Sequence, residues 1–385
     1  IVAHFADVEC LKNRISSDIW SLLQMRLRNE VTRIATLNAL RRIAESPLDT
    51  SMGKYLEDTI ECLATFMRQQ MRTLKLTTLV TADAVVMKWG RDVSESGYAS
   101  LIQHIGGLVH ERDLHMSHLA IQMAVSCVTA NGNNHQNIEQ YVLQPALALA
   151  CSPLLQEGPA LTSLLSLLSS VVNSTTSITA DQLREMLVQP IEKQGNVPRQ
   201  TILCVSKCVA TCAVSGGDQS DTIDIFLNTV RASGSNGADI DGKASVQLAL
   251  HCIGEIGCTR DLSGHSGLSD AVLEAIQSKA DEVRSAAAFC MGSMSVGNMK
   301  AFVPQVLSAL GKGNSQYQLL TSIKEMVSRH VSNRALSFDP YMSAVLPVLQ
   351  NSAVHEEEAV RNMVAECFGE LSALNSNVVL PVLEA

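Results

Sequence analysis

Three cysteines recur at intervals of four residues near the middle of the chain, at Cys204, Cys208 and Cys212. Thiolates are good zinc ligands, so this set is first considered as a metal site. The spacing places all three thiols on one face of a helix, and a single straight helix cannot surround a tetrahedral ion with three ligands. No return pair of Cys or His follows at the usual spacing. The pattern therefore predicts a buried apolar stripe rather than a metal site.

A second group that could do chemistry is His115 and His118, with Glu111 and Asp113 just before them. Imidazole and carboxylate groups at short spacing can bind a metal ion. These residues lie at the expected start of a helix, however, where polar side chains cap the backbone and face solvent. We therefore expect an ordinary helix terminus here and no metal ligands.

The remaining polar motifs do not indicate catalysis. The pairs Gly106-Gly107 and Gly216-Gly217 lack the strand-loop-helix context of a phosphate-binding loop. The run Glu356-Glu357-Glu358 lies at a helix start, where the helix dipole favours acidic side chains. No Gly-x-Ser-x-Gly motif occurs in the sequence. The sequence predicts a protein that is not an enzyme and that needs no cofactor and no metal. Activity lost on mutation of Cys204 or His115 would overturn that prediction.

The helices that carry these residues are best defined at Leu268–Lys279 and Asp281–Asn298. Each has apolar residues at intervals of three and four, which predicts an amphipathic helix, and the short turn between them predicts an antiparallel hairpin. Gly292 lies where another helix could approach closely. We expect Arg284, beside Asp281, and its counterpart Arg361, beside Glu358, to form local ion pairs between the turns of adjacent repeats.

This hairpin repeats along the chain. Cys252-Ile253-Gly254 returns as Cys290-Met291-Gly292 and as Cys367-Phe368-Gly369, so the glycines are 38 and 77 residues apart, one and two periods. A period near 40 is typical of HEAT and armadillo repeats, whose hairpins bury their apolar faces only by stacking. The sequence predicts an all-α HEAT-repeat solenoid of about ten antiparallel hairpins, wound into a curved superhelix.

We expect residues 1–385 to form one continuous array that is a fragment of a longer solenoid, because neither end has the polar face of a capping repeat. Residues 232–242 are rich in Gly, Ser and Asp and could form a mobile loop. No uncharged apolar run is long enough to predict a membrane span. The eleven cysteines do not form the framework of a small disulfide-rich protein, which fits a cytoplasmic and nuclear location.

The net charge of the chain is −9, and residues 1–100 carry a net charge of +1, from 13 basic and 12 acidic residues. No block is basic enough to predict nucleic acid binding. Acidic repeats favour a protein partner with a basic face.

Several long motifs resemble a known family. The family is that of the cullin-associated, neddylation-dissociated HEAT proteins. The motifs similar to that family are GEIG at 254–257, RDLSG at 260–264, VLEAIQSKADEVRSAAAFCMGSMSVGN at 272–298, RLRNEVTRIATLNAL at 26–40 and EAVRNMVAECFGEL at 358–371. The resemblance spans nearly the whole chain, and the order of motifs indicates the middle and later-middle of the family's array.

The resemblance implies a non-enzymatic scaffold that wraps an unneddylated cullin bound to its RING subunit. Such a scaffold competes with adaptor and substrate-receptor modules and promotes their exchange on SCF-type ubiquitin ligases. Contact residues cannot be transferred, because the matching motifs are mostly core positions. Among exposed second-helix residues we expect Arg41, Arg42, Glu366 and Glu370 to face the concave side and bind the partner. The alternative is another HEAT scaffold, such as a nuclear transport receptor or a phosphatase scaffold subunit.

Overall fold

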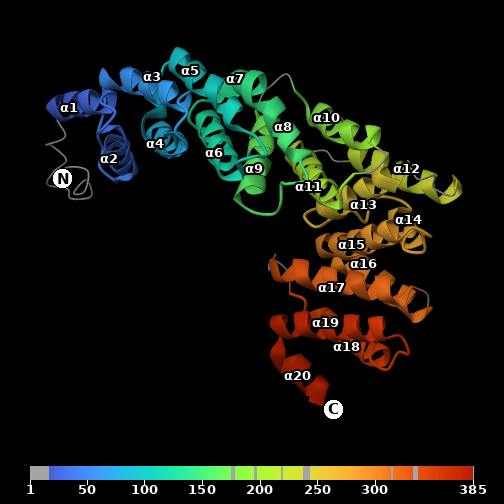
Figure 1. The fold of residues 1–385 in the computed structure, drawn as a ribbon. Coiled ribbons are helices and arrows are strands. Elements are labelled where there is room, and N and C mark those ends of the chain that lie inside the picture. The colour runs from blue at the N-terminus through green and yellow to red at the C-terminus, as the bar shows by residue number, and fades with distance from the viewer. Residues whose placement is uncertain are drawn as a thin grey trace. The chain divides into compact units, whose positions relative to one another are not determined.

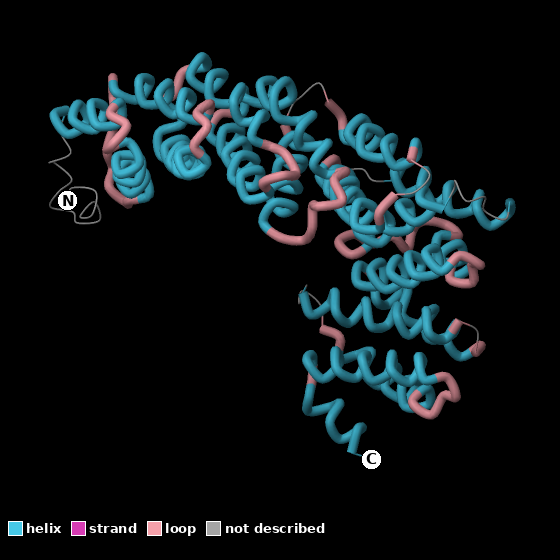
Figure 2. The backbone as a smooth tube through the Cα atoms, in the orientation of Figure 1, coloured by secondary structure: helices cyan, strands magenta, loops and turns pink. Residues whose placement is uncertain are grey.

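The computed structural model describes residues 17–174, 178–194, 197–217, 220–236, 243–313, 315–332 and 337–384. Within these ranges the regular elements are helices joined by short loops, as Figure 2 shows. The chain divides into two compact units, residues 1–179 and residues 180–385. Figure 1 labels the helices in chain order. Each unit is described separately below.

The first unit consists of helical hairpins stacked in two layers. The first helices α1, α3 and α5 pack on one another, and so do the second helices α2, α4, α6 and α9 (Figure 1). The segment from α7 to α8 passes through a π-helical turn and serves as the first helix of the fourth hairpin. The elements are α1 (Ser17–Arg28), α2 (Arg33–Glu45), α3 (Tyr55–Met67), α4 (Arg72–Trp89), η3 (Gly90–Asp92), α5 (Glu95–Ile105), η4 (Gly106–Leu108), α6 (Leu114–Ala130), η5 (Gly132–Asn134), α7 (His135–Ile138), η6 (Glu139–Leu143), α8 (Gln144–Ala150) and α9 (Pro159–Asn173).

The second unit repeats the plan. Its second helices α11, α13, α15, α17 and α19 pack directly on one another in chain order, and Figure 1 shows α15, α17 and α19 as successive rows. The elements are α10 (Ala180–Lys193), α11 (Arg199–Ser215), α12 (Ser220–Asn236), α13 (Lys243–Gly257), α14 (Leu268–Ala275), α15 (Asp281–Gly297), α16 (Met299–Gly311), α17 (Gln316–Ser332), α18 (Asp339–Ser352), α19 (Glu358–Leu374) and α20 (Ser376–Glu384).

The predicted fold class, an all-α HEAT-repeat solenoid, is confirmed. In the described ranges the helices pair as α1/α2, α3/α4, α5/α6, α7–α8/α9, α10/α11, α12/α13, α14/α15, α16/α17 and α18/α19, and α20 follows. These nine pairs agree with the expected number of about ten. The expectation of one continuous array over residues 1–385 stays a prediction. Of the predicted mobile loop at 232–242, residues 232–236 lie in α12 and residues 237–242 lie outside the described residues. None of the described helices is both long enough and apolar enough to span a bilayer.

The second helices form because their apolar residues recur along a wide stripe. In α15 this stripe is nearly continuous: Val283, Ala286, Cys290 and Met294 are all at most 4% exposed. Burial of each large apolar side chain stabilises the fold by roughly 1.5–3 kcal/mol, and the short side chains allow close packing on two neighbours. Asn298 ends α15 and caps α16 by accepting a hydrogen bond from the backbone N–H of Ala301 at 3.0 Å.

An arginine closes three of the intra-hairpin turns in the same way. The guanidinium of Arg33 donates to the carbonyl oxygens of the residues six and five positions before it, Leu27 and Arg28, at 3.3 and 3.4 Å. Arg284 bonds to the carbonyls of residues 278 and 279, and Arg361 to those of residues 355 and 356. Arg284 forms an ion pair with Asp281 as expected, but the pair lies within one turn, so the prediction that these arginines join adjacent repeats was wrong. These side chains act within their own turns because the last carbonyls before the second helix are unpaired acceptors.

The glycines of the repeated triplets allow neighbouring second helices to approach closely. A Cβ atom built on Gly292 would lie 2.5 Å from the carbonyl oxygen of Ser322 in α17. One built on Gly254 would lie 3.0 Å from the ring of Phe289 in α15. The prediction of a close approach at Gly292 is therefore confirmed, and these contacts fix the spacing of α13, α15 and α17.

Candidate interaction surfaces

The two predicted arginines lie next to each other on α2 in the first unit. Arg42 is exposed, and Arg41 is half-buried with its Nε atom 3.5 Å from a carboxylate oxygen of Glu45, one turn later. An exposed pair at this spacing contributes a few tenths of a kcal/mol. Arg41 can therefore change partners at low cost, and both side chains stay candidates for contact with a partner protein.

The two predicted glutamates lie one turn apart on α19 in the second unit. Glu366 is exposed and forms an ion pair with Lys324 of α17. Glu370 is half-buried and close enough to act on the same ammonium group. The hydrogen bond to Glu366 raises the pKa of Lys324, although burial opposes it, and the charge of Glu370 adds to the effect. With two carboxylates and one ammonium group, this part of the α17–α19 surface carries a net negative charge.

The structure brings together a polar group that the sequence did not reveal. Arg329 of α17 reaches across α15 and forms two hydrogen bonds to the carboxylate of Glu255 in α13, at 2.9 and 3.0 Å. Its Nε also donates to Glu325 at 2.7 Å. The guanidinium lies 4.9 Å from the ring centroid of Phe289 in α15, within cation–π range. Three consecutive second helices are thereby joined by one side chain.

Burial shapes the charges around Arg329. Burial is the largest single effect on the pKa of Arg329, and it lowers that pKa. The hydrogen bonds and charges of Glu255 and Glu325 together outweigh burial, so the pKa of Arg329 is raised. His251 lies one turn before Glu255, with its ring 4.5 Å from that of Phe289. Burial lowers the pKa of His251 to about 3, so its imidazole is neutral at physiological pH. No local spacing signals this group, because Glu255 and Arg329 are 74 residues apart in the sequence.

In the first unit, polar contacts also join successive second helices. Asp83 of α4 accepts hydrogen bonds from Gln122 at 3.1 Å and from Ser126 at 2.6 Å, both on α6. Arg72 at the start of α4 forms a two-bond ion pair with Asp113, with distances of 2.6 and 3.0 Å. The hydrogen bond from Arg72 lowers the pKa of Asp113 to about 2. These contacts set the register of α4 against α6.

The sets first considered as metal sites occupy ordinary structural positions. Cys204, Cys208 and Cys212 are at most 1% exposed, which confirms the predicted buried stripe. Burial raises the pKa of Cys212 to about 12. His115 is exposed at the start of α6, and the Nδ1 atom of His118 lies 3.3 Å from the hydroxyl of Ser163 in α9. Among the described residues no group of three or more potential metal ligands is assembled.

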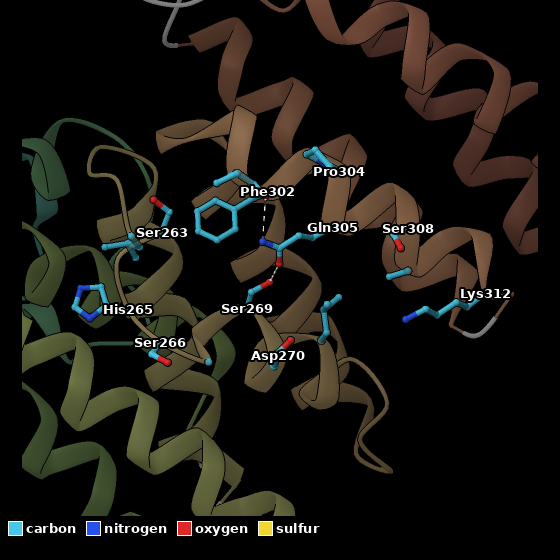
Figure 3. Close-up of a pocket in the computed structure, with 15 residues that line it drawn as sticks. Ser263, His265, Ser266, Ser269, Asp270, Phe302, Pro304, Gln305, Ser308 and Lys312 are labelled. Carbon is cyan, nitrogen blue, oxygen red and sulfur yellow. Dashed lines mark hydrogen bonds between the residues drawn. The ribbon is translucent and has the colours of Figure 1, made fainter.

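A surface groove of about 720 Å³ lies between the first helices α14 and α16 (Figure 3). Ser269 and Gln305 meet at its centre, where the serine hydroxyl donates to the amide oxygen. The amide nitrogen of Gln305 in turn donates to the carbonyl of Ala301 at 3.1 Å. His265 and Lys312 lie toward opposite ends of the groove. Because the central polar groups satisfy one another, this arrangement does not direct a nucleophile or an acid–base pair at a substrate.

Curated relatives share sequence with almost all of the chain. A protein of Arabidopsis thaliana called cullin-associated NEDD8-dissociated protein 1 is 32% identical over 93% of this chain. Its namesake in Dictyostelium discoideum is 29% identical over 96%, and cullin-associated NEDD8-dissociated protein 2 of Rattus norvegicus is 27% identical over 94%. The chain resembles the cullin-associated NEDD8-dissociated proteins. The resemblance expected from the motifs is therefore confirmed. The chain spans about 30% of the length of these relatives, and no family model matches it.

Solved structures with a similar fold include those of yeast importin-beta. Yeast importin-beta (Kap95p) superposes with a TM-score of 0.60 at 14% identity, covering 97% of this chain and 47% of that one. The importin chain in the Kap95:Nup1 complex gives a TM-score of 0.62 at 14% identity, with 99% of this chain and 49% of that chain covered. At this identity the likeness shows the fold alone, a HEAT-repeat solenoid.

Proposed function

We propose that this chain is part of a non-enzymatic scaffold that binds an unneddylated cullin with its RING subunit and promotes the exchange of adaptor and substrate-receptor modules. The observation that carries the proposal is the 32% identity, over 93% of the chain, to a protein named for its association with cullins. The partner in this proposal is a protein, and neither a nucleic acid nor a membrane is involved. We further propose a reducing location, in the cytoplasm and nucleus, because Cys127, Cys212, Cys252 and Cys290 are buried as free thiols.

Stacked hairpins suit a protein that has to hold a partner and release it. Each repeat contacts only its neighbours, so an extended partner meets many small contact areas rather than one large pocket. Contacts at one repeat can then be lost while those at others persist. A competing module can therefore displace the scaffold in steps, without breaking the whole interface at once.

Two ion pairs on the second helices support this reading. Glu366 of α19 is held by Lys324 of α17, and Arg41 is held by Glu45 within α2, in exposed or half-exposed pairs that contribute little to stability. Such groups can exchange an internal partner for one on a bound protein at small cost. Charged groups of this kind govern association rate and specificity more than total affinity, which fits a scaffold that promotes the exchange of adaptor and substrate-receptor modules.

The test is to pass unmodified cullin–RING and the same complex conjugated to NEDD8 over immobilised chain 1–385 and to measure both affinities. We expect the unmodified complex to bind at least about tenfold more tightly, a difference of roughly 1.4 kcal/mol. Pre-loading the cullin with its adaptor should reduce the amount bound. Equal binding of both forms would refute the preference for unneddylated cullin. Retention of a Ran-type GTPase or a phosphatase catalytic subunit in place of the cullin would favour the alternative scaffolds.

A further inference from the structure

The intra-hairpin turns of the first unit form a continuous edge. Arg33 of the first turn lies with its guanidinium 4.4 Å from the ring centroid of Phe66, at the end of α3 beside the second turn. Arg72, which follows the second turn, is hydrogen-bonded to Asp113 of the third at 2.6 Å. The turns α1–α2, α3–α4 and α5–α6 are therefore neighbours along one side of the unit.

This edge is rich in arginine although the chain as a whole is acidic. We call it the basic edge and define it by the arginines of the three turns, Arg26, Arg28, Arg33, Arg68, Arg72 and Arg112. The same turns hold three carboxylates, and two of these are already engaged. Asp113 is held by Arg72, and Glu111 accepts a hydrogen bond from the hydroxyl of Ser152 at 2.6 Å. Arg28 is in turn paired with Asp58 of α3 at 3.8 Å. The six arginines still outnumber these four carboxylates, so the edge has an excess of positive charge in a chain of net charge −9.

One arginine in each turn is available for a ligand. The side chains of Arg26, Arg68 and Arg112 are exposed and form no ion pair or hydrogen bond with any residue that the structure describes. Arg68 does affect one nearby group, His104. Burial is the main cause that lowers the pKa of His104, and the positive charge of Arg68 lowers it further. Packed helices lie about 8–10 Å apart, so adjacent guanidinium groups should follow a similar spacing. An extended peptide covers that distance in about three residues, at roughly 3.3 Å each.

Apolar side chains lie between these charges. Val31 in the first turn is 92% exposed, and Met71 at the end of the second is 59% exposed. Apolar side chains of a peptide could cover both residues. The sugar-phosphate backbone of a nucleic acid offers no such contact, and the described residues of these turns include no exposed Phe, Tyr or Trp on which bases could stack.

We propose that the basic edge binds an extended acidic segment of a partner protein, with carboxylates about three residues apart and apolar residues between them. The charges on the edge and its two exposed apolar side chains complement a segment of this kind. The arginines available for a ligand, Arg26, Arg68 and Arg112, do not lie on the second helices to which the proposed function assigns cullin contacts, so either proposal can fail without the other.

The test uses the full 385-residue chain and a fluorescein-labelled ten-residue peptide with Glu at positions 2, 5 and 8 and Leu at positions 3 and 6. Fluorescence anisotropy should show binding that weakens as salt is added. A peptide of the same composition with its three glutamates adjacent should bind several-fold more weakly. A single-stranded oligonucleotide of matched charge that bound more tightly than the peptide would overturn the proposal.

Two variants separate the basic edge from general electrostatic attraction. We expect R26E/R68E to reduce peptide affinity at least about tenfold. The matched control K54E/R91E changes two exposed cations in the inter-hairpin loops of the same unit and should leave affinity within about twofold. Arg26 and Arg68 lie at helix C-termini, where positive charge is stabilising, so R26Q/R68Q serves as a variant without charge reversal. Equal losses in the edge and control variants, or no loss in either edge variant, would refute the proposal.

Discussion

The repeated glycine triplets provide a sharp test of how the second unit is held together. Gly254, Gly292 and Gly369 occupy the same place in three repeats. A Cβ at Gly292 would lie 2.5 Å from the carbonyl oxygen of Ser322 and 2.8 Å from Cβ of Glu325. No described atom lies within 4 Å of a Cβ built on Gly369. The substitution Gly→Ala is therefore chemically identical at the two sites but meets different surroundings.

The two substitutions should have opposite effects on stability. Replacing a helical glycine by alanine gains roughly 0.8–1 kcal/mol in helix propensity. At Gly369 that gain is the whole effect. At Gly292 the new methyl group has to displace the backbone of α17, and overpacking of this kind costs about 1–3 kcal/mol or more. We expect Gly292→Ala to destabilise the unit by about 2 kcal/mol net, and Gly369→Ala to stabilise it by about 1 kcal/mol.

Thermal unfolding followed by circular dichroism at 222 nm measures the difference. In a unit of about 200 residues, 1 kcal/mol shifts the Tm by roughly 2–4 °C. Gly292→Ala should lower the Tm by about 4–8 °C, and Gly369→Ala should raise it by about 2–4 °C. Shifts of the same sign and size would show that the close approach of α15 and α17 does not depend on the missing side chain, and would refute the packing argument.

Three other predictions concern charged side chains. Arg329→Gln should destabilise the chain by about 2–4 kcal/mol, measured by urea titration, because it leaves the carboxylate of Glu255 without its cation, and the Glu255 side chain is only 11% exposed. Adding Glu255→Gln should recover part of that loss. Asp113→Asn should lower the unfolding midpoint at pH 7. The folded pKa of Asp113 is depressed to about 2, so its stabilisation is complete above the unfolded pKa near 4 and lost as pH falls toward 2; a difference that persisted at pH 2 would contradict the assignment. Arg41→Glu with Arg42→Glu should weaken cullin binding roughly tenfold at low salt, and unchanged affinity would remove both residues from the interface.

The helices and their pairing could be predicted because they depend on local pattern. The stripe of α15, the turn after Lys279 and the close approach at Gly292 follow from spacings of three and four and from the absence of a side chain. The end of α17 was less predictable. The helix continues to Ser332, with His330 3% exposed and its ring 5.6 Å from that of Phe338. That tertiary contact stabilises a further turn of helix that no local signal indicates.

The sequence by itself determined that the chain would be helical, that its hairpins would recur about every 39 residues, and which faces would be buried, because helix periodicity acts within one or two turns. Only the tertiary structure decided which charges meet. The two hydrogen bonds between Arg329 and Glu255 join residues 74 positions apart, and the ion pair between Arg72 and Asp113 joins residues 41 apart. Such pairs depend on the rotation and offset between stacked repeats. These are set by the summed packing of many side chains, so no short stretch of sequence specifies them.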